Sequence, residues 1–157
     1  MSALSSELKW VDNHCHFEES DEVSLDLQEA AIEGVEKFIV VGTDLETSLK
    51  AKELSQIFPE KIFATAGIHP HEAIHGTHGI EALLSEGQIV AVGECGFDFY
   101  YDHSPHEEQE KVFREQITYA HKFDLPLVIH TREAWNETFK VLDEMEMPSK
   151  TVFHCFT

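Results

Sequence analysis

Short apolar runs rich in β-branched residues recur along the chain and alternate with stretches of helical spacing. Runs of this kind are typical of buried strands. They predict six strands, at residues 10–17, 37–42, 61–69, 88–94, 126–130 and 150–153. Because strand and helix alternate, the strands are expected to be parallel and joined by right-handed crossovers. This leaves two architectures, an open doubly wound sheet or a (β/α) barrel.

The helical stretches contain residues that mark helix ends. Residues 28–35 close around Gly34, which suits a C-terminal cap. Asp44 is the expected N-cap of the next helix, and Pro59 ends it. Both boundaries support the alternation of strand and helix.

The stretch SPHE contains the clearest helix start in the sequence. Ser104 is the expected cap, Pro105 takes the first helical position, and Glu107 completes a capping box. The two helices after this point are predicted to have apolar faces, formed by Phe113, Ile117 and Ala120 in the first and by Trp135, Phe139 and Leu142 in the second.

Polar residues at the strand ends distinguish between an open doubly wound sheet and a (β/α) barrel. Five predicted strands carry such residues at or near their C-terminal ends: His14, His16, His69, Glu94, His130 and His154. A barrel gathers these ends around one mouth, where its active site lies, whereas an open sheet spreads them. The sequence also lacks GxGxxG and GxxxxGK[ST], the motifs of nucleotide-binding open sheets. We therefore predict a (β/α) barrel.

The chain length limits how much of a barrel it forms. A complete TIM-type barrel has eight strands and usually needs about 250 residues. This chain has 157 residues and six predicted strands. We expect one domain over residues 1–157, an incomplete TIM-type α/β barrel with about six of the eight βα units.

Composition narrows the functional classes. The formal charge of −19, from 30 acidic and 11 basic residues, argues against a protein that coats duplex nucleic acid. Bound divalent cations would supply positive charge locally, so a metal-dependent enzyme could still act on phosphates. The N-terminal MSALSSELKW has no apolar core of signal-peptide length, and no apolar run approaches the ~18 residues of a membrane span. We expect a cytoplasmic protein without a membrane partner.

The stretch DNHCHF contains the first candidate metal ligands. Side chains alternate along a strand, so His14 and His16 would point to one side and Cys15 to the other. Two imidazoles from one strand could then bind one metal ion. Cys15 lies between His14 and His16, whereas Cys95 directly follows Glu94 and Cys155 directly follows His154. The three cysteines lack the C-x₂₋₄-C spacing of structural zinc sites. They are expected to pack as small apolar side chains, without disulfides.

Glu94 is the candidate link between two metal ions. Any one histidine of this chain is more often structural than a ligand, but the convergence of several histidines and a glutamate on one rim favours a metal site. Imidazole and carboxylate are the ligands expected for zinc, manganese or a similar ion. A carboxylate can bridge two ions, and two ions about 4 Å apart would hold a phosphodiester, one activating water and the other stabilising the leaving oxygen.

Five blocks of the sequence resemble, in order and spacing, the motifs of the TatD family of metal-dependent deoxyribonucleases, in the amidohydrolase superfamily. The blocks are DNHCHF, TAGIHPHE, AVGECGFDFYYD, EEQEKVFREQITYAHKFDLPLVIHTREA and FHCFT. The resemblance extends over residues 11–157. It implies a (β/α) barrel, two divalent ions (Zn, Mn or Mg) and hydrolysis of ester bonds by metal-activated water, typically 3′-to-5′ exonuclease action on DNA.

The resemblance also implies roles for individual residues. His14 and His16 would bind one ion, Glu94 would bridge as the catalytic carboxylate, and His130 and His154 would bind the second ion. The family's last ligand is an aspartate on a strand beyond HCFTG. This sequence ends before that strand, so we expect the first ion to lack a ligand and the water-activating carboxylate to be missing.

Other polar residues are candidates for contacts around this site. His69 and His71, on the turn after a strand, could contact a phosphate or relay a proton, or serve only the turn. Arg132 could present its planar fork to a phosphate or form a surface salt bridge. Asp98 and Asp102 could hold a ligand histidine or lie solvated on a loop. With the resemblance, His69, His71 and Arg132 are predicted to bind substrate.

The sequence leaves two alternatives open. The same site could hydrolyse another ester, an amide or an aminoacyl bond, because it polarises carbonyls as well as phosphoryl groups. Alternatively, the chain is a non-catalytic fragment or one subunit of a split barrel. Strand edges left open would then pair through self-association or with a partner chain.

Overall fold

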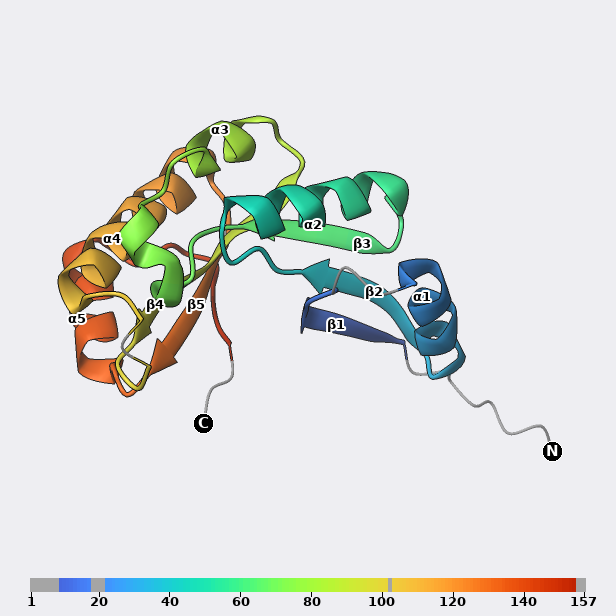
Figure 1. Ribbon diagram of the computed structural model, residues 1–157, viewed down its shortest axis with the longest axis horizontal. Helices are drawn as coiled ribbons and strands as arrows, with labels where there is room; N and C mark the ends of the chain where they lie inside the picture. The colour runs from blue at the N-terminus through green and yellow to red at the C-terminus, as the bar shows by residue number, and fades with distance from the viewer. Residues whose placement is uncertain (1–8, 18–21, 102, 155–157) are drawn as a thin grey trace.

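The computed structural model describes residues 9–17, 22–101 and 103–154, and its six strands form one sheet in chain order (Figure 1). The strands are β1 (Trp10–Cys15), β2 (Val35–Val40), β3 (Ile62–Ala66), β4 (Ile89–Asp98), β5 (Leu127–Arg132) and β6 (Thr151–Phe153). Every ladder between neighbours is parallel. The sheet curls into part of a barrel, which confirms the predicted incomplete TIM-type fold.

Helices connect the strands and lie along the outer side of the curled sheet (Figure 1). They are α1 (Val23–Ile32), α2 (Leu45–Ile57), the 3₁₀ helix η1 (Pro70–His75), α3 (Ile80–Ser85), α4 (His106–Phe123) and α5 (Trp135–Glu144). None of these described helices is both long and apolar enough to cross a membrane.

The predicted element boundaries hold in part. Gly34 follows α1 with φ 87°, as expected for a glycine that ends a helix, but α1 starts earlier than residue 28. Asp44 caps α2 as predicted: its Oδ1 accepts the Thr47 N–H at 2.7 Å, and Thr47 Oγ1 accepts the Asp44 N–H at 3.0 Å. This reciprocal pair is a capping box. The helix ends at Ile57, two residues before Pro59.

The capping box predicted at Ser104 is wrong. The first turn of α4 has no side-chain cap, and Ser104 is buried against η1. Its hydroxyl donates to the His71 carbonyl at 2.7 Å and accepts the Ile74 N–H at 3.2 Å. Ser104 therefore fixes η1 next to α4 instead of capping the start of the helix, because the His71 carbonyl and the Ile74 N–H reach its hydroxyl in the folded chain.

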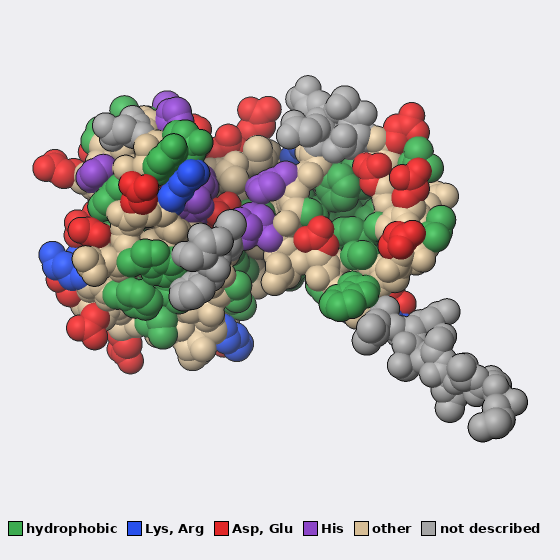
Figure 2. Space-filling view, turned by 90° about the horizontal axis from the view of Figure 1, so that it is seen from below, with side chains coloured by type: hydrophobic (Ala, Val, Ile, Leu, Met, Phe, Trp, Pro, Cys, Tyr) green, Lys and Arg blue, Asp and Glu red, His purple; other side chains and the backbone are tan. Residues whose placement is uncertain are grey.

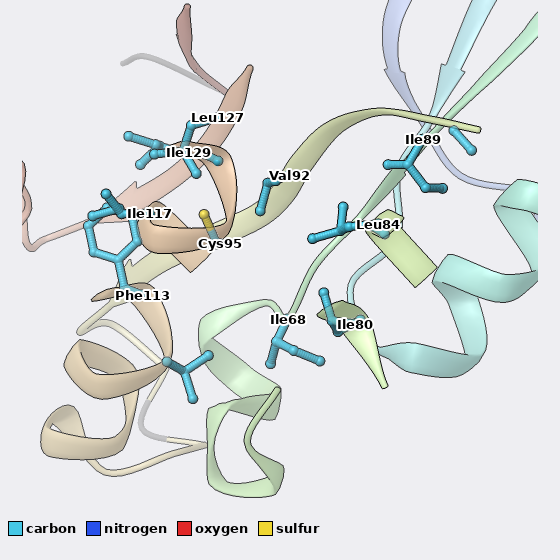
Figure 3. Close-up of a cluster of buried hydrophobic side chains, with 14 of the residues drawn as sticks. Ile68, Ile80, Leu84, Ile89, Val92, Cys95, Phe113, Ile117, Leu127 and Ile129 are labelled. Carbon is cyan, nitrogen blue, oxygen red and sulfur yellow. The ribbon is translucent and has the colours of Figure 1, made fainter. Parts of the chain in front are cut away.

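The core lies between the sheet and the outer helices (Figure 3). Three residues of α4, Phe113, Ile117 and Ala120, are buried as predicted and contact the strand side chains of this cluster. The face of α5 is only partly buried: Leu142 is 2% exposed, but Phe139 is 51% exposed. The Phe139 ring lies 5.7 Å from that of Phe153, beside the last strand.

The two described cysteines pack as apolar residues. Cys95 is fully buried in the core, and Cys15 packs partly against it. Burial raises the pKa of the Cys15 thiol to about 12 and that of Cys95 well above its ordinary value. Cys155 lies outside the described residues. For Cys15 and Cys95, the structure supports packing and not a thiolate ligand.

Candidate metal centre

A buried glutamate lies where several strands converge. Glu94 is 4% exposed and belongs to β4, the longest strand of the sheet. Its Oε2 lies 3.3 Å from His14 Nε2, and its Oε1 lies 3.1 Å from His130 Nδ1. The carboxylate therefore presents one oxygen to β1 and the other to β5.

The histidines around Glu94 form two groups with metal-ligand spacing. One group contains His14, Glu94 and His154, and the other contains His69, Glu94 and His130. Within each group, one potential ligand atom from every residue lies within 4.8 Å of the others. Figure 2 shows histidine side chains gathered toward the middle of one face of the molecule. Glu94 belongs to both groups, as a bridging carboxylate would.

The curl of the sheet brings its outer strands together at this point. His14 lies on β1 and His154 directly follows β6, yet their rings stack with centroids 3.4 Å apart and planes 13° apart. A flat sheet in this strand order would hold β1 and β6 at opposite edges. The curl therefore creates the first ligand group.

His16 lies outside both groups. It is exposed, and its ring centroid lies 5.2 Å from that of His14. Side-chain alternation would direct His16 to the same side as His14 only if His16 were part of the strand, but β1 ends at Cys15. Its role as a ligand stays a prediction.

The charges of Glu94 and its neighbours follow from burial and hydrogen bonding. Burial by itself raises the pKa of Glu94, but hydrogen bonds from His130 and His14 outweigh it, and the pKa lies well below its usual range. Burial lowers the pKa of His130, but contacts with Glu94 and Asp98 outweigh this and raise it. Burial lowers the pKa of His69 to about 3. At neutral pH the site thus contains an ionised Glu94 and an uncharged His69.

Hydrogen bonds also determine which nitrogen of each ring carries a proton. His69 Nδ1 accepts the His71 N–H at 3.2 Å, so the neutral His69 ring carries its proton on Nε2. Both nitrogens of His130 face carboxylate oxygens, Nδ1 toward Glu94 at 3.1 Å and Nε2 toward Asp98 at 3.0 Å. His130 therefore has hydrogen-bond acceptors on both sides.

Asp98 is a buried residue of the site and not a solvated loop carboxylate. It is 1% exposed. Its Oδ1 accepts the N–H groups of Tyr100 and Tyr101, at 3.0 and 2.9 Å, and its Oδ2 lies 3.0 Å from Nε2 of both His71 and His130. Of the two alternatives for Asp98, the structure supports the one in which it holds a histidine. Asp102 lies outside the described residues.

Two glutamines that the sequence analysis did not identify hold the backbone beside the site. Gln116 Oε1 accepts the Ile68 N–H at 2.8 Å, and its Nε2 donates to the Ile68 carbonyl at 3.0 Å. Gln109 binds the N–H and carbonyl of Asp98 in the same way, at 2.9 and 3.2 Å. Both side chains are fully buried on α4. Their spacing of two helical turns within an otherwise apolar face is the signal that could have identified them.

Arg132, at the end of β5, lies against two tyrosines. Its guanidinium carbon is 4.1 Å from the Tyr100 ring centroid and 4.7 Å from that of Tyr101. All three residues are exposed and lie beside Asp98 at the rim of the sheet. Arg132 thus makes cation–π contacts with two tyrosines whose N–H groups are bound by Asp98, the residue that also contacts His130.

These features define the class of the protein: a (β/α)-barrel chain with a histidine–carboxylate site at the C-terminal ends of its strands. The chain belongs to the family of TatD related DNases, whose sequence model matches residues 11–157.

Individual relatives agree with this assignment. The chain is 36% identical over 155 residues to the "uncharacterized metal-dependent hydrolase YabD" of Bacillus subtilis, covering 93% of this chain and 60% of that protein. It is 34% identical over 138 residues to the "3′-5′ ssDNA/RNA exonuclease TatD" of a Rahnella species, covering 83% and 52% respectively. The crystal structure of the TatD homologue YJJV from Escherichia coli superposes with a TM-score of 0.83 at 29% identity, covering 94% of this chain and 60% of that one. The chain thus spans a little over half the length of these relatives.

Proposed function

We propose that this chain contributes the metal-binding side of a divalent-metal-dependent phosphodiesterase, a deoxyribonuclease that removes nucleotides from the 3′ end of DNA. The observation that carries the proposal is the buried Glu94 carboxylate, which directs one oxygen to each of two histidine groups. The names of the relatives, a metal-dependent hydrolase and 3′-5′ exonucleases, support metal-dependent hydrolysis and favour phosphodiesters over other ester, amide or aminoacyl substrates.

The donor set fits two divalent ions. His14 and His154 with Glu94 would hold one ion, and Glu94 with His130 would hold the other. This differs from the pairing that the resemblance implies, in which His154 joins His130 at the second ion, because His154 lies in the group of His14. His16 remains a predicted additional ligand of the first ion. Imidazole and carboxylate donors suit zinc or manganese better than magnesium, which prefers oxygen. When bound, the ions supply activation of water and neutralisation of phosphate charge.

His130 is suited to a ligand role by its second hydrogen bond. Loss of the proton from Nδ1 would free this nitrogen for a cation, while Asp98 keeps accepting the Nε2–H at 3.0 Å. A carboxylate in this position fixes the tautomer and orientation of a ligand histidine and makes it a better donor. Asp98 is therefore assigned to orienting His130.

His69 is better suited to hold substrate than metal. Its Nδ1 accepts the His71 N–H, so the proton of the neutral ring is on Nε2. Such an uncharged N–H can donate to a phosphate oxygen of the substrate. Arg132 can bind a second phosphate oxygen, and His71, held by Asp98, lies next to His69 with ring centroids 4.4 Å apart.

The test combines metal binding with nuclease activity. Native mass spectrometry of the purified chain with Mn²⁺ or Zn²⁺ should show two ions per site, and the same spectrum gives the number of subunits, including any self-association or partner. A 5′-labelled single-stranded DNA oligonucleotide should then be shortened from its 3′ end in a metal-dependent way.

The matched variants are Glu94→Gln and Glu60→Gln, a buried and an exposed position. Loss of residues that only orient a ligand costs about 10- to 100-fold, so Glu94→Gln should lower activity by at least about 100-fold. His130→Ala should act in the same direction, and Glu60→Gln should leave activity unchanged. Unchanged metal-dependent activity in both Glu94→Gln and His130→Ala would refute the site assignment.

A further inference from the structure

Two large aromatic residues are exposed beside the metal centre. Tyr100 is 53% exposed and Tyr101 is 44% exposed, and their rings are perpendicular with centroids 4.7 Å apart. Single exposed aromatics are common on soluble proteins and need no function. This pair differs because it adjoins the histidine groups and is held in place on two sides.

The first constraint on the tyrosines comes from their backbone. Asp98 Oδ1 accepts both of their N–H groups, at 3.0 and 2.9 Å, while Oδ2 of the same carboxylate contacts His130. One buried carboxylate therefore sets the position of the tyrosines relative to a candidate ligand. Aromatic rings on a fixed backbone lose little conformational entropy when a planar group binds to them.

The second constraint comes from Arg132. Its guanidinium lies over both rings, at 4.1 Å from Tyr100 and 4.7 Å from Tyr101, and remains exposed. A phosphate contact at Arg132 would therefore place the attached nucleoside next to an aromatic surface. Tyr100 is still 53% exposed with Arg132 in this position.

The charge of the chain favours an aromatic contribution to binding. With a net charge of −19, the protein repels a polyanion at long range. Proteins that bind single strands gain affinity by stacking unpaired bases on aromatic rings, a contribution that needs no net positive charge. A base within a duplex already has both faces stacked and is not available for this contact.

We propose that Tyr100 and Tyr101, with Arg132, form a platform on which an unpaired nucleobase stacks next to the metal centre. This proposal deepens the proposed function and rests on it for the nature of the reaction. The platform binds the base, and the histidine groups bind the phosphate to be cleaved.

The test measures binding without cleavage. Fluorescence anisotropy in EDTA compares a labelled oligothymidylate, an abasic oligonucleotide of equal length, and a duplex. The parent chain should bind oligothymidylate more tightly than the other two. Tyr100→Leu and Tyr101→Leu should each weaken this binding by about 5- to 100-fold, the range expected for loss of one stacked base.

Matched variants separate the ring from the fold and from the hydroxyl. Tyr100→Phe and Tyr101→Phe keep the ring, and binding should stay within about twofold of the parent. Phe139→Leu removes another exposed aromatic ring, on α5, and should leave the affinity for oligothymidylate unchanged. Circular dichroism verifies that each variant is folded. A phosphate contact at Arg132, whose guanidinium lies over both rings, should contribute a slope of about −0.7 to the dependence of log affinity on log salt.

The proposal is overturned if the parent binds the abasic strand or the duplex as tightly as oligothymidylate, if it binds none of them, or if the leucine variants bind like the parent. Hydrolysis of bis(p-nitrophenyl) phosphate by the parent with Mn²⁺ tests the proposed function separately, because this substrate has no nucleobase. Hydrolysis without base-dependent binding refutes only the platform. Base-dependent binding without any metal-dependent hydrolysis refutes only the proposed function.

Discussion

Replacement of Gln116 by leucine tests whether the α4 glutamines hold the backbone beside the metal centre. The side chain is fully buried, and it binds both the N–H and the carbonyl of Ile68, at 2.8 and 3.0 Å. Ile68 immediately precedes His69. Leucine is similar in size but has no polar atoms, so Gln116→Leu leaves these two backbone groups without their glutamine partner.

The cost can be worked out from these contacts. A buried polar group that loses its partner costs about 1–3 kcal/mol, so two groups cost about 2–6 kcal/mol. The apolar surface that leucine gains offsets part of this. We expect the free energy of unfolding to fall by about 2–5 kcal/mol, a large fraction of the 5–15 kcal/mol of an ordinary domain.

Urea denaturation followed by circular dichroism measures this change. The matched control is Gln56→Leu, the same substitution at an exposed glutamine whose Nε2 donates to Gln88 Oε1 at 2.6 Å. An exposed substitution of this kind should change stability by about 0.5 kcal/mol or less. The reasoning is wrong if Gln116→Leu and Gln56→Leu have the same midpoint and slope as the parent.

Three further outcomes are expected. Asp44→Ala removes the α2 capping box and should lower the free energy of unfolding by about 1 kcal/mol in urea denaturation; no change would contradict the capping role. In the metal-free chain, the pKa of His69 is lowered to about 3, so below its ordinary pKa of about 6.5 the unfolded chain binds a proton that the folded chain does not. The contribution of His69 to stability should therefore decrease as pH falls from about 6.5 toward 3, by up to about 1.4 kcal/mol per pH unit. Comparing the urea midpoints of the parent and His69→Gln at several pH values isolates this contribution from those of Glu94, His130, His71 and Asp98; equal pH dependence in both proteins would contradict it. Burial raises the pKa of Cys95 far above its ordinary value, so iodoacetamide at about pH 8 should leave Cys95 unmodified in the folded chain and modify it in urea, as read by peptide mapping. Equal modification in both conditions would show that the thiol is accessible.

Strand β3 and the first part of β4 could be predicted because buried parallel strands form nearly continuous apolar runs. The continuation of β4 to Asp98 could not, because Gly93, Glu94 and Gly96 interrupt the apolar pattern. The structure explains Gly96: a Cβ at this position would collide with the backbone carbonyl of His130 on β5. The glycine is required by a neighbouring strand, and this reason is not visible in the local sequence.

The site could be anticipated where it depends on strand geometry and not where it depends on distant partners. His14, Glu94 and His130 lie on strands in the positions that alternation and parallel packing suggest, and the structure brings them together. His16 departs from this pattern because the strand ends before it. The partners of Ser104 lie on a separate element, so its apparent capping sequence gave the wrong prediction.

The stacking of His14 on His154 also bears on how the chain acquires its ions. In the described sheet, each strand pairs only with its neighbours in the chain, so β1 and β6 are linked through all five ladders. The group of His69, Glu94 and His130 can form once β3, β4 and β5 have paired. The group of His14, Glu94 and His154 forms only when the whole sheet, from β1 to β6, is in place. By mass action, an ion bound to the group of His14, Glu94 and His154 stabilises only the fully folded chain. During synthesis, the order in which the two groups become competent therefore follows the order in which the strands join the sheet.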